Sequence, residues 1–178
     1  MEQKVNVWKA NLTNGLILGL AGIVYTLGLY FLDQTFNKSL GYLFFLLTIV
    51  ILYFLIKSYR NTFLFGYITY GQAVGVGVVI FLYYSVISGI FTYLLYIVID
   101  PGLTAKMLAY VEETMVKTGK IPAEQLDTVM SFQKKFLKPE IMVPIGIVSN
   151  MFFGTIISLL VSIFIRKEGN PLIDAPVN

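Results

Sequence analysis

Four long apolar runs without a single charged residue decide which folds are open to this chain. They span Leu16–Leu32, Leu40–Ile56, Ala73–Ile99 and Ile141–Ile165. A helix needs about 20 apolar residues to cross a bilayer, and in hydrocarbon only helices and closed barrels satisfy their own backbone hydrogen bonds. Runs this long and uniformly apolar predict an all-α fold, a polytopic transmembrane bundle of four helices, with spans at about 13–32, 40–57, 71–99 and 141–165.

The composition agrees with a protein that lies in lipid. Only 13% of the residues are charged and the mean hydropathy is +0.77, whereas ordinary soluble domains contain about 25% charged residues. The length suits a single membrane domain over residues 1–178. The chain has neither cysteine nor histidine, which excludes disulfides, Cys- or His-ligated metal sites and serine–histidine catalysis within it.

Basic residues at the ends of the runs predict the orientation of the chain. Four spans place both termini on one side of the membrane, and that side carries Lys4, Lys9, Lys57, Arg60, Arg166 and Lys167. Because basic residues concentrate in cytoplasmic segments, we expect a multi-pass membrane protein with both termini cytoplasmic. The first run exceeds the roughly 7–15 apolar residues of a secretory signal, so we expect it to remain as a membrane anchor.

The charged excursion between the third and fourth runs, residues 100–140, predicts an extramembrane amphipathic helical hairpin. Its signals are a helix-opening Asp100-Pro101-Gly102, a stop at Gly119, a restart at Pro122 and a closing Pro139. The two apolar stripes are Leu103, Met107, Val111 and Met115, then Leu126, Val129, Met130 and Leu137. One interpretation of the hairpin is a lid that packs against the bundle or lies on the headgroups. The other is a docking surface for another protein. The tail at 168–178 is expected to be short and disordered.

Small and polar residues recur every four positions along the fourth run and predict a helix-packing ridge. The ridge consists of Gly146, Asn150, Gly154, Ser158 and Ser162. Such stripes let two helices approach closely, and close packing drives helix association in lipid. We expect a buried helix–helix contact here, with its partner helix in the same molecule or in another.

Polar side chains near mid-depth form a second candidate site, a polar cluster of Tyr25, Tyr83, Tyr84, Ser88 and Asn150. A polar group alone in hydrocarbon is costly, so these side chains should face inward and pair. They make either plain hydrogen bonds between helices or a small polar cavity with Asn150 at its centre.

Three short segments carry a resemblance to a known group. They are Tyr67–Ala73 (YITYGQA), Asp100-Pro101-Gly102 and Ile121–Leu126 (IPAEQL). In these segments and in its layout the chain resembles domain-of-unknown-function family 4199, a group of uncharacterised four-span membrane proteins typical of Bacteroidota. The resemblance implies four spans, an outer helical hairpin and a location in a bacterial inner (plasma) membrane, and it brings no established activity or site.

The leading functional hypothesis is a non-enzymatic accessory or scaffold component of the bacterial cell envelope. Its expected partners are membrane lipids and, through the hairpin at 100–140, another membrane or envelope protein. No Asp, Glu, Lys, Arg or His lies within the four runs, and such residues are the usual mark of proton relays and coupled transport. The alternative is a small transporter or lipid-handling protein that uses the polar cluster. We expect no catalytic, cofactor or metal site. We also expect no nucleic-acid partner, because no basic-aromatic stripe is present.

Overall fold

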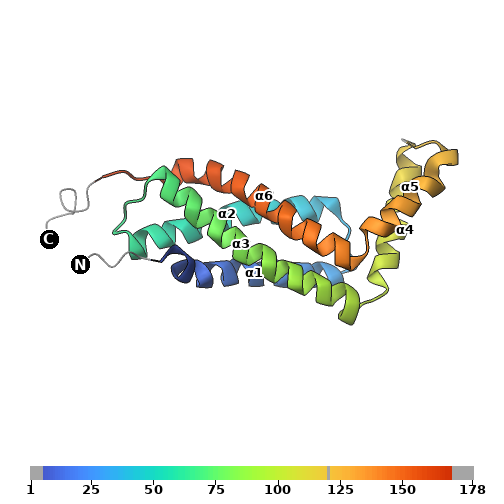
Figure 1. Cartoon of the computed structure of the whole chain (residues 1–178), viewed down its shortest axis with the longest axis horizontal. Helices are drawn as coiled ribbons and strands as arrows, with labels where there is room; N and C mark the ends of the chain where they lie inside the picture. The colour runs from blue at the N-terminus through green and yellow to red at the C-terminus, as the bar shows by residue number, and fades with distance from the viewer. Residues whose placement is uncertain (1–5, 120, 170–178) are drawn as a thin grey trace. The chain divides into compact units, whose positions relative to one another are not determined.

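The computed structural model describes residues 6–119 and 121–169, and this part of the chain contains helices and no strand. The helices are α1 (Val7–Phe31), α2 (Lys38–Phe63), α3 (Tyr70–Leu94), α4 (Leu103–Thr118), α5 (Ala123–Phe136) and α6 (Pro139–Ile165) (Figure 1). A π-helical segment, η1 (Leu95–Ile99), continues α3. Four helices are long and apolar enough to cross a membrane, namely α1, α2, α6 and α3 with its π-helical extension. The predicted all-α bundle is thereby confirmed.

The chain divides into two compact units, which we describe separately. The first consists of Met1–Ile87 with Ser149–Asn178, and the second of Ser88–Val148. Helices α3 and α6 each contribute residues to both units. The tail that was predicted to be disordered lies outside the described residues from position 170 onward.

Asparagine side chains open the first two membrane helices. Before α1, Asn6 Oδ1 accepts hydrogen bonds from the backbone N–H groups of Trp8 (3.0 Å) and Lys9 (3.3 Å). Asn37 Oδ1 caps α2 in the same way through the N–H of Ser39 at 3.0 Å. Because these caps set where the helix begins, α1 starts at Val7, about six residues before the apolar span predicted from position 13.

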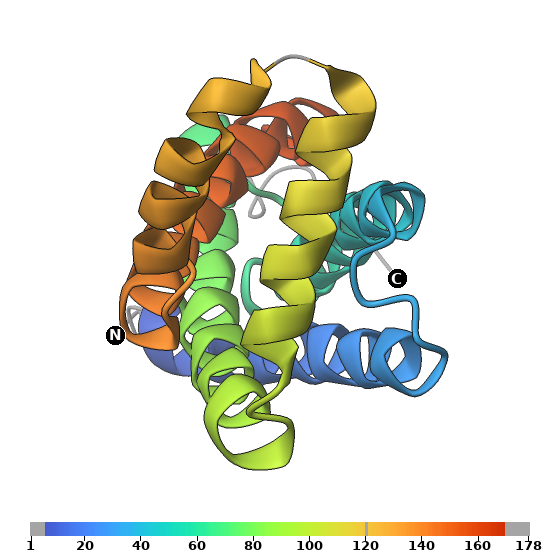
Figure 2. The same cartoon turned by 90° about the vertical axis from the view of Figure 1, so that its right-hand side faces the viewer.

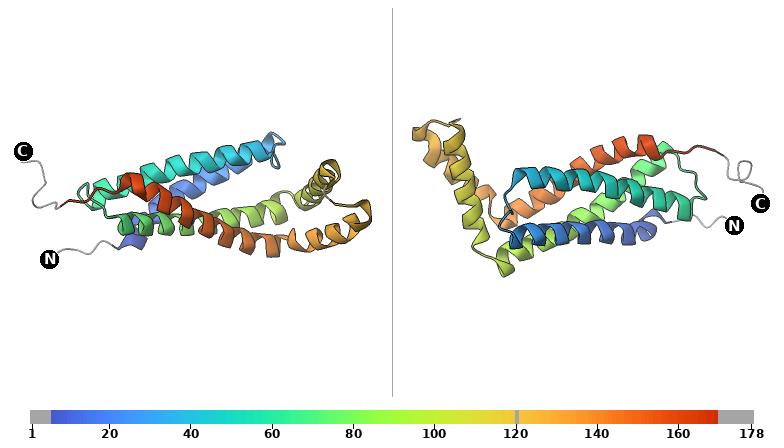
Figure 3. Two further views of the ribbon diagram at one scale, coloured as in Figure 1. Left: turned by 90° about the horizontal axis from the view of Figure 1, so that it is seen from above. Right: turned by 180° about the vertical axis from the view of Figure 1, so that it is seen from behind.

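The first unit packs α1, α2 and its portions of α3 and α6 side by side (Figure 3). Side chains from all four helices form one buried apolar core, including Leu18, Leu52, Ile56, Val76, Ile80, Ile157 and Val161. The outward faces carry large exposed apolar side chains, for example Leu20, Phe54 and Phe164. Exposed apolar faces on four candidate spans are suited to lipid contact.

The second unit contains the end of α3, η1, the α4–α5 hairpin and the start of α6. Asp100 organises the entry into α4, because its Oδ1 accepts from Gly102 N (3.0 Å) and its Oδ2 forms a 2.9 Å ion pair with Lys106 Nζ. At the end of α4, Gly119 adopts a left-handed conformation with φ +60°, which a glycine tolerates without strain. The chain then reverses, and α5 packs antiparallel to α4 (Figure 2).

Pro139 differs in role from the sequence-based expectation. It was predicted to close the second hairpin helix, but α5 ends at Phe136 and Pro139 is the first residue of α6. At a first helical position the missing N–H of proline has no intrahelical partner to lose, so proline is well suited there.

Candidate functional site

The predicted packing ridge lies partly in a tight crossing of α6 with α3. A Cβ atom at Gly154 would overlap the ring of Phe81 and lie 2.7 Å from its Cβ. A Cβ at Gly77 would lie 2.7 Å from the Cβ of Ser158, whose hydroxyl donates to the Gly154 carbonyl at 2.7 Å. The two helices therefore approach closely because each carries a glycine where the other presents a side chain.

The remaining ridge positions have different surroundings. Ser162 is fully buried, and its hydroxyl has no hydrogen-bond partner among the described residues. Asn150 is half-buried. Gly146 belongs to the second unit, where a Cβ added to it would meet nothing within 4 Å. The tight contact is therefore made by the part of the ridge toward the end of α6.

Helix α1 uses glycine in the same way against α3. A Cβ at Gly15 would overlap the Cβ of Tyr83, and a Cβ at Gly19 would lie 2.8 Å from Ile87 Cγ2. The glycines at the α3–α6 and α1–α3 crossings thus make helix contacts within one molecule.

The five residues of the predicted polar cluster do not gather around one cavity. Tyr25 donates its hydroxyl to the Leu40 carbonyl at 2.8 Å, and its ring stacks on Phe44 with centroids 4.8 Å apart. Tyr83 donates to the Trp8 carbonyl at 3.3 Å. These two hydroxyls connect α1 to its neighbours, and Ser88 lies in the second unit.

Tyr84 and Asn150, the other two members, line one small hollow. It lies between α2, α3 and α6, has a volume of about 180 Å³ and is also lined by Thr48. The Thr48 hydroxyl is satisfied by the Phe44 carbonyl at 2.8 Å. The side chain of Asn150 makes no hydrogen bond to any described residue, so its amide is available to a group that enters the hollow.

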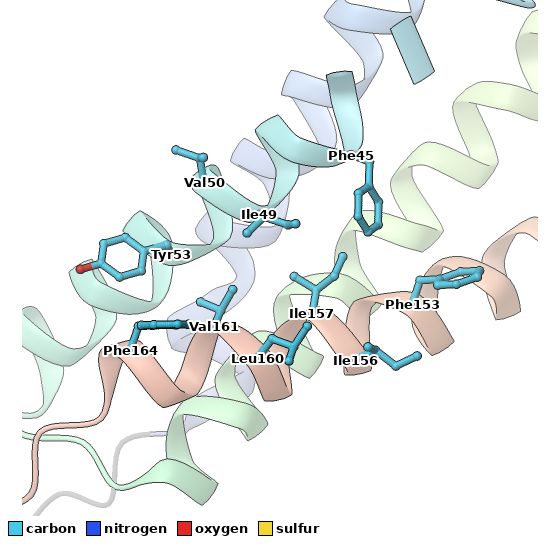
Figure 4. Close-up of a pocket in the computed structure, with 10 residues that line it drawn as sticks. All are labelled: Phe45, Ile49, Val50, Tyr53, Phe153, Ile156, Ile157, Leu160, Val161 and Phe164. Atoms are coloured by element: carbon cyan, nitrogen blue, oxygen red, sulfur yellow. The ribbon is translucent and has the colours of Figure 1, made fainter. Parts of the chain in front are cut away.

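A larger groove of about 370 Å³ adjoins this hollow and was not foreseen from the sequence. It separates α2 from α6, and Phe45, Phe153 and Ile157 line both spaces. Figure 4 shows Tyr53 and Phe164 at one end of the groove and Phe45 and Phe153 at the other. The Tyr53 hydroxyl is the polar atom among side chains that are otherwise hydrocarbon: Phe45, Ile49, Val50, Phe153, Ile156, Ile157, Leu160, Val161 and Phe164.

Basic side chains gather where α2 and α6 end. Lys57 Nζ lies 5.8 Å from the centre of the Tyr53 ring, one helical turn beyond the groove. Arg60 Nη1 donates to the Ile165 carbonyl at 3.0 Å and so caps the last turn of α6. Ile68 and Lys167 exchange two backbone hydrogen bonds of 3.0 Å, which fasten the α2–α3 loop to the segment after α6.

The hairpin of the second unit has a separate surface feature on α5. Phe132 and Phe136, one helical turn apart, are 57% and 56% exposed. Lys135 Nζ lies 5.8 Å from the Phe132 ring centre. We call Phe132, Phe136 and Lys135 the aromatic–basic face. On α4, Glu113 forms a 2.6 Å ion pair with Lys117, and the hydrogen bond raises the pKa of that ammonium.

Comparison with known proteins supplies a family and no described activity. No curated protein and no solved structure matches the chain. Within residues 6–119 and 121–169, no group of three or more acidic, cysteine or histidine side chains is placed to hold a metal ion. Residues 13–167 match the family described as protein of unknown function (DUF4199). Since this match covers most of a chain with four candidate membrane helices, the protein belongs to the DUF4199 family.

Proposed function

We propose that this protein is a non-enzymatic accessory or scaffold component of a bacterial cell envelope. It lies in the inner membrane with both termini in the cytoplasm, and it binds a partner protein through the α4–α5 hairpin. The single observation that carries the proposal is the exposed pair Phe132 and Phe136 on α5, a helix outside the four candidate spans.

The two phenylalanines are not needed for pairing α4 with α5. The predicted stripe residues Met107, Val111 and Val129 are each partly buried in the second unit, whereas more than half of each phenylalanine remains uncovered. Burying one phenylalanine side chain contributes about 1.5–3 kcal/mol. Exposed apolar side chains rimmed by charges are typical of sites that bind another protein or a membrane. The neighbouring Lys134 and Lys135 favour a partner with acidic groups around an apolar patch.

The test is a pair of matched variants purified from native membranes in mild detergent and weighed by native mass spectrometry. Phe132→Ser combined with Phe136→Ser removes the aromatic pair, while Val116→Ser changes an apolar residue on α4 that is 62% exposed. We expect a stoichiometric second protein with the wild type and with Val116→Ser, and its loss with the double variant. Equal recovery from all three proteins would refute docking through this face.

A second candidate function, lipid handling, is favoured by a different observation. The groove between α2 and α6 is lined by hydrocarbon and adjoins the hollow that contains the unpaired amide of Asn150. If the hollow takes part, Asn150→Leu should abolish lipid retention while leaving expression unchanged. Retention equal to that of the wild type would remove the hollow from the mechanism.

A further inference from the structure

We infer that the groove between α2 and α6 holds one acyl chain of an anionic phospholipid, with its phosphate beside Lys57. This inference rests on the lipid-handling candidate and names the class of lipid and the residue that selects it.

The side chains that line the groove disfavour polar ligands. Apart from the Tyr53 hydroxyl, the lining side chains offer nothing that could replace the water around a polar solute, and desolvation without compensating hydrogen bonds is unfavourable. The volume of about 370 Å³ falls in the lower part of the range for small-molecule sites. A flexible hydrocarbon chain satisfies both conditions.

The length of the groove corresponds to one leaflet. It follows α2 from Phe45 to Tyr53 (Figure 4), and at 1.5 Å per residue this is about 12 Å. Half of a hydrocarbon core of about 30 Å is about 15 Å. A chain that enters beside Tyr53 would thus reach the middle of the membrane at Phe45, where the hollow begins.

The charge at the end of the groove selects the headgroup. Lys57 is the first charged residue after the second apolar run, which places it at the boundary between hydrocarbon and headgroups. Its ammonium lies over the Tyr53 ring, and it takes part in neither of the two ion pairs found among the described residues. An ammonium there attracts a lipid whose headgroup has a net negative charge more strongly than it attracts a zwitterionic lipid.

The walls also argue against a transmembrane helix as the occupant. Helices associate tightly in lipid where small residues let their backbones approach. The groove presents large side chains instead, among them Phe45, Tyr53, Phe153 and Phe164. The glycines of the α1–α3 and α3–α6 crossings already face neighbours within the molecule.

The test uses the full-length protein in mixed phosphatidylglycerol and phosphatidylcholine, followed by native mass spectrometry of the retained lipid. Leu160→Trp enlarges a groove-lining residue that is 57% exposed, so the substitution should not disturb the core. Leu20→Trp is the matched control, 56% exposed on α1 and away from the groove. Lys57→Gln removes the charge at the groove, and Lys38→Gln removes one at the start of α2.

We expect one retained phosphatidylglycerol in the wild type and in Leu20→Trp, and its loss in Leu160→Trp. Lys57→Gln should lower the preference for phosphatidylglycerol about fivefold, because one lysine near the surface contributes about that factor, and Lys38→Gln should not. Equal retention by the two tryptophan variants would overturn the groove as a lipid site and with it the lipid-handling candidate. An unchanged preference in Lys57→Gln would overturn the headgroup assignment alone. A dimer that Leu160→Trp dissociates would make the groove a contact between two copies and overturn the inference.

Discussion

Because α3 and α6 cross closely, two glycine-to-alanine substitutions should have opposite effects on the stability of the protein. Gly154→Ala should destabilise the protein, because the new methyl group would overlap Phe81 near the α3 backbone, where the ring cannot easily move away. Gly75→Ala, on the same bundle, places its methyl group in open space, with nothing within 4 Å. Both substitutions add the same methyl group, so the difference between their effects on the free energy of unfolding reports the packing contact at Gly154.

The magnitudes follow from two opposing effects. Alanine is favoured over glycine in a helix by about 1 kcal/mol, whereas an extra methyl group in a well-packed contact costs about 1–3 kcal/mol. At Gly154 the cost should be near the upper limit because the contacts involve the Cβ and ring base of Phe81. We expect a net loss of about 1–2 kcal/mol for Gly154→Ala and a gain of up to about 1 kcal/mol for Gly75→Ala.

The assay is unfolding in mixed micelles titrated with dodecyl sulfate, followed by circular dichroism. Phe81→Ala removes the Cγ and Cδ1 atoms that the new methyl group would overlap. Adding it to Gly154→Ala should therefore recover part of the loss, and a double-mutant cycle would measure this coupling. If Gly154→Ala and Gly75→Ala proved equally stable, or the cycle showed no coupling, the inferred α3–α6 crossing would be refuted.

Two further predictions concern the orientation of the chain and the end of α6. Because the chain has no cysteine, a single introduced cysteine can report the side of the membrane on which it lies. Thr118→Cys should react with a membrane-impermeant maleimide in intact spheroplasts, and Glu168→Cys should react only after permeabilisation. The reverse pattern would invert the proposed orientation. Arg60→Gln loses the 3.0 Å charged hydrogen bond to the Ile165 carbonyl and should lower the free energy of unfolding by about 1 kcal/mol, with faster amide exchange in the last turn of α6; exchange unchanged from the wild type would show that the cap does not stabilise this turn.

The four spans and the hairpin could be predicted from the sequence because each depends on local information. A span needs only enough consecutive apolar residues, and the hairpin follows from Asp100, Gly119 and the change to amphipathic spacing. The helix ends were less accurate. Hydropathy marks the embedded part of a helix, whereas the Asn6 cap sets its first residue, and Pro139 begins a helix that it was expected to precede.

The candidate sites were harder to predict because they depend on which helices are neighbours. Tyr25 and Tyr83 are polar residues within the apolar runs like Tyr84 and Asn150, yet they hydrogen-bond to different backbone carbonyls, while the latter two share a hollow. No local pattern distinguishes these environments. The groove between α2 and α6 had no sequence signal, since the residues that line it have the same apolar character as those that face lipid elsewhere.

The sequence by itself determined that this is an all-α protein with four helices able to cross a membrane and a charged hairpin between the third and fourth. Only the tertiary structure decided that Gly154 and Ser158 meet α3, whereas a Cβ added at Gly146 would meet nothing within 4 Å, and that α2 and α6 enclose a groove. The physical reason is that a helix in lipid is apolar on all its faces. Hydropathy therefore carries no periodic signal for the buried side, and the arrangement follows from how the shapes of neighbouring helices fit together.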